Sequence, residues 1–265
     1  MAKKTLSAEF SENLVREVTK DYQTRQAERR PYELAWQLNM NFLMGNQYCS
    51  VSPRGVIEQE EKNFYWQEKQ VFNHIAPIVE TRLARLSRVR PKMSVRPFSA
   101  SQDDISSAKT ATKVLESVGE QLALDKRISE ATAWSEVAGT VFYKIAWDGG
   151  KGEKFAAKSG DVALGDVSVT VVPPFEIYPD SNVAANLDEC GSVIHAKAYS
   201  ASDVERIWGK KVEGSKIKVF AMGGERAAVG GYGYNSFIPS VTGETKNDHV
   251  VVIEKYTRPS GEYPD

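Results

Sequence analysis

Apolar residues recur at every third or fourth position through much of the first 140 residues, which is the spacing of one face of a helix. In the N-terminal segment this series consists of Phe10, Leu14, Val18 and Tyr22, with Ser7 or Ser11 as the cap. Pro31 lies in the same pattern, and a proline removes one helix hydrogen bond and crowds the preceding turn. We therefore expect a break near residues 29–30 and a second helix from Pro31 to Met44, ended by Gly45.

Three more helices are expected before residue 140. The first begins near Asn73, holds Pro77 in its first turn, and keeps an apolar stripe until Pro91 ends it. The second begins after Ser101, because the hydroxyl of this residue can accept a hydrogen bond from the first turn. The third covers residues 127–139.

Beyond residue 140 the pattern changes to short runs of β-branched and aromatic residues that are typical of strands. The expected strands are Thr140–Trp147, Asp166–Val172, Val193–Tyr199, Lys216–Met222 and Val250–Thr257. A short edge strand is also expected at Met93–Phe98, where prolines bound an alternating segment. The pattern predicts a short helix at Ala201–Trp208, capped by Ser200, and a loop or a small hairpin at residues 46–70.

These segments predict an α+β fold, mainly helical over residues 1–147 and mainly β over residues 148–265. Residues 222–236 are glycine-rich and form a loop within the β part. No return strand follows Val250–Thr257, and an unpaired apolar strand is a liability that native proteins avoid. Either this strand pairs with an earlier one or the chain is cut inside a hairpin, and we favour the second interpretation.

The composition is that of an ordinary globular protein, with 41% hydrophobic and 26% charged residues in 265. This length suits one large domain or two small ones. No apolar run is long enough to cross a membrane, and the N-terminal residues lack the apolar core of a secretory signal. Two cysteines, Cys49 and Cys190, are too few for a disulfide framework or a zinc ribbon, which indicates a reducing compartment.

No sequence signature of catalysis is present. The histidines fit no metal-binding spacing, and neither a phosphate-binding loop nor a nucleophile elbow occurs. We therefore expect no catalytic, cofactor-binding or metal-binding residues, and no enzymatic activity. A hydrolase or transferase site assembled from scattered residues such as Asp180 and His195 is a third hypothesis. It requires a deep pocket that holds two titratable groups with strongly shifted pKa values.

Charge is unevenly distributed along the chain. Residues 1–100 hold 16 of the 34 Lys and Arg and 11 of the 35 Asp and Glu, which leaves 18 against 24 for the remainder. The densest group is the basic strip, which consists of Arg82, Arg85, Arg88, Arg90, Lys92 and Arg96. Its first three members recur three apart and so share one flank of a helix. Such a strip is a solvated flank, pairs with acidic groups of a neighbouring helix or subunit, or contacts phosphates without reading bases.

Three segments give the chain a resemblance to a known family. Phe72–Val118 combines a helix that starts at an Asn, a segment with the pattern RP-x-apolar-x-V-x-P, an Asp-rich cap and a helix carrying an Ala-Lys pair. Trp134–Asp148 has a helix, a glycine, and a strand ending in Trp-Asp, and Val171–Ser181 leads through apolar residues to a turn. In this order the segments resemble the N-terminal region of portal proteins of short-tailed bacteriophages, over about residues 35–210. The chain departs from the family at Pro179-Asp180, where the family usually shows Asp-Pro.

The resemblance implies a structural role. Portal proteins form a dodecameric, homo-oligomeric ring at one capsid vertex of the virion, and they assemble in the host cytoplasm without a membrane. Their partners are the terminase large subunit, capsid and scaffold proteins, tail or head-completion proteins, and the double-stranded DNA that passes through the channel. This chain would be chiefly the peripheral wing, with the stem, clip and channel parts beyond its C-terminal end. The basic strip would then face a neighbouring protomer, the capsid or the scaffold.

The alternative that we retain is a stand-alone nucleic-acid-binding module that uses the basic strip. A steep fall in duplex affinity with salt is its signature. No aromatic residue is interleaved with the strip, so stacking on single-stranded bases is not indicated.

Overall fold

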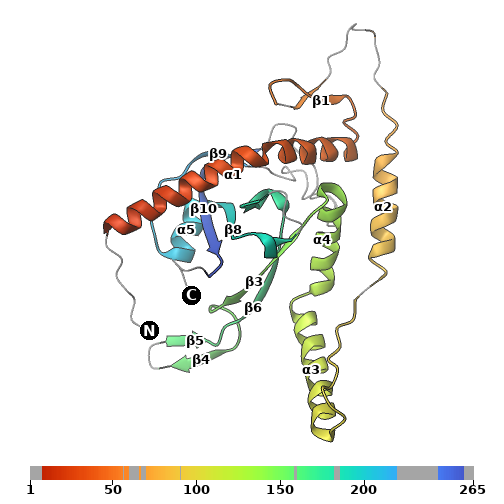
Figure 1. Ribbon diagram of the computed structural model, residues 1–265, viewed down its shortest axis with the longest axis vertical. Coiled ribbons are helices and arrows are strands. Elements are labelled where there is room, and N and C mark those ends of the chain that lie inside the picture. Colours follow the sequence, from red (N-terminus) through yellow and green to blue (C-terminus); the bar gives the residue numbers. More distant parts are fainter. Residues whose placement is uncertain are drawn as a thin grey trace. The chain divides into compact units, whose positions relative to one another are not determined.

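The computed structural model describes residues 8–55, 57–59, 66, 70–89, 91–157, 160–181, 186–219 and 244–259, and these form an α+β fold, as expected (Figure 1). Within them the helices are α1 (Ala8–Leu43), α2 (Ile75–Leu86), α3 (Gln102–Gln121), α4 (Leu124–Ala138) and α5 (Ala201–Trp208), with 3-10 turns η1 (Pro174–Glu176) and η2 (Leu187–Glu189). The strands are β1 (Cys49–Val51), β2 (Ile57–Gln59), β3 (Phe142–Asp148), β4 (Lys154–Ala157), β5 (Gly160–Ala163), β6 (Asp166–Val172), β7 (Ile177–Pro179), β8 (Ser192–Ser200), β9 (Ser215–Val219) and β10 (Glu244–Thr257).

The chain divides into two compact units. The first joins residues 1–73 to residues 175–265, and the second is the continuous segment 74–174. This division differs from the boundary at residue 147 that the sequence suggests. The reason is that α4 packs against β6, so the first strands after residue 140 belong with the helices that precede them.

The first unit is built on a four-stranded antiparallel sheet in the order β7-β8-β10-β9. Val250–Thr257 pairs residue for residue with β8. The interpretation of this segment as an unpaired strand is therefore wrong, because it pairs with an earlier strand. The buried centre of the sheet consists of Tyr178, Ile194 and Ala196, with Tyr22, Val251 and Ile253 packed against them.

Helix α1 is attached to this sheet by two buried arginines. Arg25 donates from Nη1 to the carbonyl oxygens of Tyr178 and Ser192, both at 3.1 Å. On the other side of the guanidinium, Nε and Nη2 donate to Oδ1 and Oδ2 of Asp21 at 2.9 and 2.8 Å. Because the guanidinium has a donor for each of these acceptors, its burial leaves no charge without a partner.

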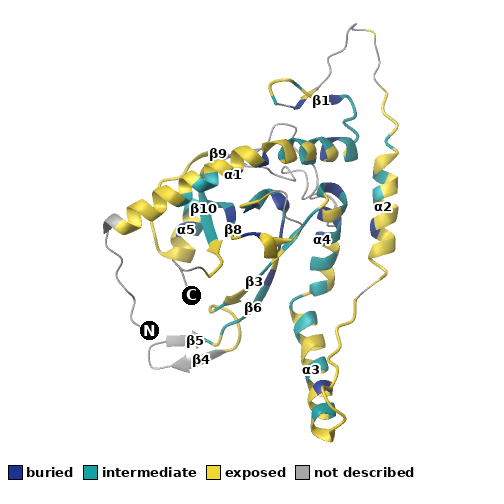
Figure 2. Cartoon of the chain, in the orientation of Figure 1, coloured by how far each residue is buried: buried dark blue, intermediate teal, exposed yellow. Residues whose placement is uncertain are grey.

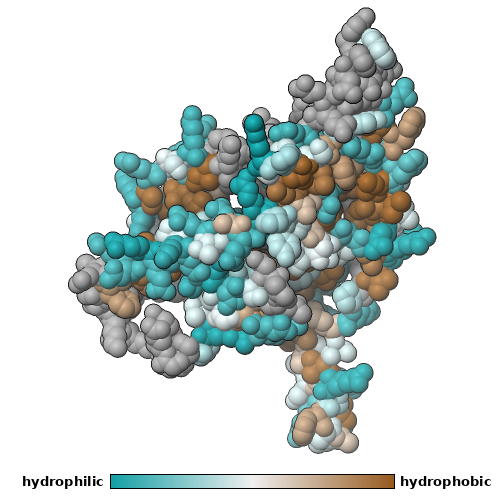
Figure 3. Space-filling view, turned by 45° about the horizontal axis from the view of Figure 1, so that its top comes forward, coloured by the Kyte–Doolittle hydropathy of each residue, from teal (hydrophilic) through white to brown (hydrophobic). Residues whose placement is uncertain are grey.

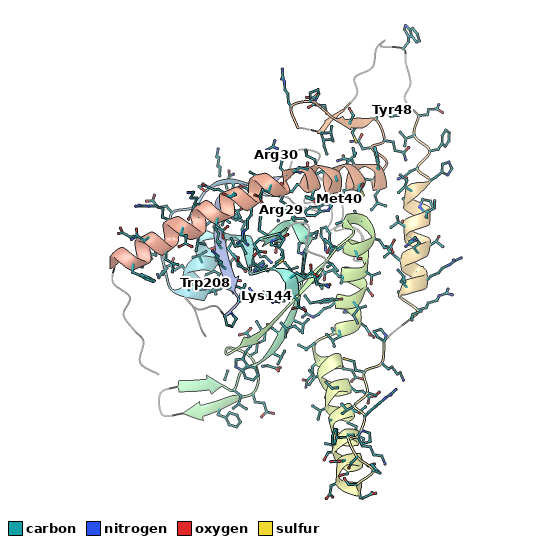
Figure 4. The ribbon with its side chains drawn as sticks, in the orientation of Figure 1. Arg29, Arg30, Met40, Tyr48, Lys144 and Trp208 are labelled. Carbon is teal, nitrogen blue, oxygen red and sulfur yellow. The ribbon has the colours of Figure 1, made fainter. Side chains whose placement is uncertain are left out.

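Arg29 repeats the arrangement one turn later (Figure 4). It donates to the carbonyl oxygens of Ile177 and Phe175, each at 2.7 Å, and pairs with the carboxylate of Glu33. Its guanidinium carbon also lies 3.5 Å from the centre of the Tyr178 ring, within cation–π distance. Polar side chains of α1 thus fix the helix on the edge strand β7.

The break expected at Pro31 does not occur, because α1 continues through it to Leu43. A proline in a helix costs about 3 kcal/mol, since one hydrogen bond is lost. Here the Arg29–Glu33 pair bridges the proline, and the carbonyl contacts of Arg29 hold the helix against β7. The helix ends as expected at Gly45, whose φ of +89° and the bond from the Asn46 N–H to the Asn41 carbonyl, 2.8 Å, form a Schellman motif.

Two small features complete the first unit. β1 and β2 pair as an antiparallel hairpin within residues 46–70, in agreement with the hairpin interpretation. Helix α5 follows Ser200, whose side chain accepts from the backbone N–H of Asp203, so the predicted cap is confirmed. Trp208 at the end of α5 packs edge-on against Tyr199 with ring centres 5.3 Å apart.

In the second unit α4 is the central element, since it contacts α2, α3 and β6. Its buried residues are Ala131, Ala133, Trp134 and Val137. Gly139 follows with φ +78°, a conformation that favours glycine, and the chain enters β3. β3 pairs with β6, and between them lies the β4–β5 hairpin, which the sequence pattern did not predict.

Most other predicted elements are confirmed with shifts of a few residues at their ends. The helix predicted near Asn73 is α2, with Pro77 in its first turn, and that predicted at 127–139 is α4. The strand predicted at Lys216–Met222 is found as β9, and its last residues, like the glycine-rich loop 222–236, lie outside the described residues.

Candidate interaction surface

Helix α2 places most of its apolar residues at the surface. Leu83 is buried, whereas Ile78 is 60% exposed and Leu86 is 45% exposed. Figure 2 accordingly shows the helix mostly in the colour of exposed residues. The apolar stripe predicted on α2 exists, but only its centre is covered in the part of the chain that the structure describes.

The first member of the basic strip has an internal partner. Arg82 donates from Nε and Nη2 to the two carboxylate oxygens of Glu136 on α4, at 2.7 and 3.0 Å. The hydrogen bond and charge of Glu136 raise the pKa of Arg82 further above its ordinary value. Arg82 therefore ties α2 to α4, and the other members of the strip are the candidates for external contacts.

Four of those members are exposed: Arg85, Arg88, Lys92 and Arg96. None of the four forms an ion pair with another described residue. Arg90 lies outside the described residues, so the structure does not place it. The basic strip thus consists of one arginine with a structural role, at least four cations that face solvent, and Arg90, which is not described.

The strand expected at Met93–Phe98 is not formed, although the segment is an extended trace (Figure 1). A strand requires a neighbour that completes its hydrogen bonds, and here the nearest element is a helix. The Val95 N–H donates to the Thr112 hydroxyl on α3 at 3.0 Å, and that hydroxyl donates onward to the Ala108 carbonyl at 2.9 Å. We call residues 91–98 the arm.

Exposed apolar side chains accompany the cations on the arm and just before it. Val89 is 76% exposed, Met93 is 49% exposed and Phe98 is fully exposed at 102%. Figure 3 shows hydrophobic surface interspersed with hydrophilic surface over α2. Apolar patches of this kind mark interaction sites, and Arg, Met and aromatic residues are enriched where proteins bind each other.

Sequence reasoning found the cations but missed the exposed apolar residues beside them. The sequence did contain a signal for an exposed apolar stripe on α2, since arginines flank that stripe and few acids accompany them. The sequence analysis also did not identify Arg25 and Arg29 as structural residues, although their spacing of four from Asp21 and Glu33 is that of intrahelical ion pairs.

His195, part of the scattered-site hypothesis, is a buried cross-link of the sheet. Its Nδ1 lies 2.9 Å from Glu254 Oε2 on β10, and its Nε2 lies 3.5 Å from Glu176 Oε2 in η1. The Tyr256 hydroxyl donates to the same Glu254 oxygen at 3.2 Å. The imidazole therefore joins three segments of the first unit, which is a structural use of the residue.

Asp180 is used separately, at the turn that precedes β8. Its Oδ2 accepts from the backbone N–H groups of Gly191 at 2.7 Å and Ser192 at 3.0 Å. Partial burial raises the pKa of Asp180, but these two N–H donors, together with the Cys190 side chain and the charge of Arg25, outweigh it and leave the pKa below its usual value. A carboxylate held in its charged form by backbone donors stabilises a turn and is a poor proton donor.

The cysteines are also buried within the first unit. Burial raises the pKa of the Cys190 thiol, and likewise that of Cys49. Neither thiol is activated as a nucleophile, because the thiolate is the reactive form. Among the described residues, no group of three or more His, Cys, Asp or Glu side chains is arranged to hold a metal ion.

Comparison with known protein families finds no family whose model matches this chain, and a search of curated proteins finds no relative. Among the described helices, none combines the length and the apolar character that crossing a bilayer requires.

Proposed function

We propose that the chain is a structural protomer of a phage portal ring, which conducts DNA at the capsid vertex and serves as the attachment site for terminase and tail. The order of segments in the sequence supports this proposal, as does the α+β fold that they form. The observation that carries it is the surface of α2 and the arm, where apolar side chains and unpaired cations lie together. In a ring, each protomer covers such a surface with its neighbour.

A second exposed apolar row in the same unit points the same way. Tyr143, Ile145 and Trp147 alternate along β3 and are all exposed. Side chains two apart on a strand share one face, so they form a continuous apolar row. A protomer with several neighbours needs more than one such surface, whereas a monomeric enzyme needs none.

The first test is negative-stain electron microscopy of the complete gene product that contains this chain. Ring-shaped particles with a central channel are expected. The double variant Arg85→Glu with Arg88→Glu is expected to lower the fraction of assembled particles, because acids replace the cations of the surface. Lys210→Glu with Lys216→Glu is the matched control, since it makes the same charge change at exposed positions of the other unit. A uniform monomer at every concentration and salt would contradict the proposal.

The exposed cations also favour one alternative, a stand-alone nucleic-acid-binding module. Arg85, Arg88, Lys92 and Arg96 have no acidic partner among the described residues, so they are available to phosphates. In that case duplex affinity falls steeply with salt. Replacing Arg85 and Arg88 by Gln lowers the slope of log affinity against log salt by about 1 for each phosphate that the variant no longer binds. An unchanged slope in this variant rules out the alternative.

A further inference from the structure

The arm presents a strand edge that has no strand beside it. Figure 1 shows it as an extended trace along α3, where its Val95 N–H is bound to the Thr112 hydroxyl. The remaining backbone groups of residues 91–98 make no hydrogen bond to the described part of the chain. All of these residues are exposed. Extended backbone with unused donors and acceptors is a template for pairing with another chain.

The positions of the prolines show which edge of the arm has a backbone N–H at every residue. In an extended chain the backbone groups of alternate residues point to opposite edges. The edge that contains the Val95 N–H faces α3, and the residues that share it are Pro91, Met93 and Pro97. Both prolines, which lack an N–H, therefore fall on the covered edge. The outer edge is formed by Lys92, Ser94, Arg96 and Phe98, and each of these has both a donor and an acceptor.

We infer that this outer edge binds an extended, acidic segment of a partner chain as an added β-strand. Backbone hydrogen bonds along Ser94 and its neighbours provide affinity in this mode, and side chains provide selectivity. Lys92 and Arg96 are four residues apart and so lie on one face of the added strand pair, where acidic side chains opposite them form favourable cross-strand pairs. The inference deepens the proposed function and rests on it, because it names the kind of protein segment that the surface receives.

The backbone pattern favours a peptide over a nucleic acid. Along the outer edge, N–H donors alternate with carbonyl acceptors, and a second peptide backbone offers the matching sequence of acceptors and donors. Phosphates accept hydrogen bonds but donate none, so they leave the carbonyls of Ser94 and Arg96 unused. A nucleic acid could be attracted by the cations alone, and the test below includes that outcome.

The test measures binding of a fluorescent peptide to the full chain by anisotropy. The probe is an eight-residue peptide in which Glu alternates with Val and Thr, and its control replaces each Glu by Gln. Ser94→Pro removes an outer-edge N–H, whereas Met93→Pro introduces the same residue on the covered edge. We expect Ser94→Pro to weaken binding about tenfold, because an added proline removes a hydrogen bond and blocks close pairing, and Met93→Pro to change it little.

Charge is tested with a second pair of variants. Lys92→Glu with Arg96→Glu is expected to weaken binding of the Glu peptide, whereas Lys210→Glu with Lys216→Glu is not. Amide hydrogen exchange of the complex is expected to slow at Ser94 and Arg96 but not at Met93. Circular dichroism of each variant confirms that the chain remains folded, which the exposed position of the arm leads us to expect.

Three results would overturn the inference. Equal binding by the two proline variants means that the outer edge takes no part. Equal affinity for the Glu and Gln peptides excludes selection for acids. Displacement of the peptide by duplex DNA, with tighter binding of the DNA, assigns the strip to nucleic acid. If rings form but the peptide does not bind, only this inference fails; if the peptide binds as described but no ring forms, only the proposed function fails.

Discussion

Two arginines on one helix add polar contacts to the aromatic packing of Tyr22 on Tyr178, and together these fix α1 to the sheet. Arg25 and Arg29 each use both sides of the guanidinium, one for a carboxylate of α1 and the other for backbone carbonyls at β7 and its neighbours. The flat fork of arginine suits this task, whereas a lysine ammonium cannot reach both acceptors in the same geometry. The attachment therefore depends on residue identity rather than on charge alone.

Replacing Arg29 by Met tests this dependence. The change leaves two carbonyls and the carboxylate of Glu33 without their donor, so we expect the free energy of unfolding to fall by about 3–5 kcal/mol. Arg30→Met is the matched control, because the adjacent Arg30 is exposed and bonds only weakly to the Gly55 carbonyl at 3.3 Å. Urea unfolding measures both. A decrease of similar size in the two variants contradicts the role given to Arg29.

Asp21 makes the stability of this attachment depend on pH. Partial burial raises the pKa of Asp21, but the hydrogen bonds and charges of Arg25 and Lys255 outweigh it, so the pKa lies below its usual value. The folded protein thus holds the carboxylate charged more strongly than the unfolded chain does. The corresponding stability is present above about pH 4 and is lost as pH falls through the lower, folded pKa.

We therefore expect Asp21→Asn to flatten the acid side of the stability curve. Urea unfolding at a series of pH values below about pH 6 measures the effect. Glu12→Gln, an exposed acid on the same helix, is the control and should keep the slope of the unmodified chain. An unchanged slope in Asp21→Asn would mean that other carboxylates dominate acid unfolding.

At the scale of elements, the serine caps of two helices were predicted correctly. Ser101 and Ser200 cap α3 and α5 as expected, since a hydroxyl before a helix acts on the next turn and needs no distant partner. The break at Pro31 was predicted wrongly because the contacts of Arg29 that sustain the helix come from residues far along the chain. The strand at Met93–Phe98 was wrong for the same physical reason, since a strand exists only where another strand pairs with it.

The cap of α3 provides a test at this scale. Ser101 Oγ accepts from the Asp104 N–H at 3.2 Å, and burial plays little part, so Ser101→Ala should lower the unfolding free energy by about 1 kcal/mol. Ser107→Ala, an exposed position inside the same helix, should be neutral or slightly stabilising because alanine is the better helix former. Thermal unfolding distinguishes the two. Equal effects would mean that the cap contributes nothing.

The candidate surface was predictable in its charges but not in its extent. The basic strip is visible in the sequence, yet the partner of Arg82 on α4 is fifty-four positions away and could not be inferred. An apolar stripe such as that of α2 looks the same in sequence whether the chain covers it or leaves it exposed. Only the structure separates Leu83, which is buried, from Ile78, which is not.

At the scale of the whole molecule, the second unit is a continuous segment between the two parts of the first. The pairings that define it, α2 with α4, α3 with α4, α4 with β6 and β3 with β6, all lie within residues 74–174. A segment whose contacts are internal can fold without its flanking chain.

We therefore expect residues 74–174, produced alone, to show helical circular dichroism and a cooperative thermal transition. Trp134 is buried among α4 contacts, so its near-ultraviolet signal and protected fluorescence report on packing rather than on helix content alone. The matched control is Trp134→Ala in the same fragment, which should lose cooperativity. A fragment with the spectrum of an unfolded chain would show that this unit needs the rest of the molecule.

The divided first unit also has a consequence for synthesis. Arg25 and Arg29 leave the ribosome early, whereas the carbonyls that receive them belong to residues 175–178 and 192, which follow the whole of residues 74–174. At about 5–20 residues per second, translation of that segment takes on the order of 5–20 seconds. During this interval the nascent helix presents its sheet-binding side to solvent, while the second unit can already fold. The sheet-binding side of α1 is thus accessible to chaperones until residues 175–192 have been made.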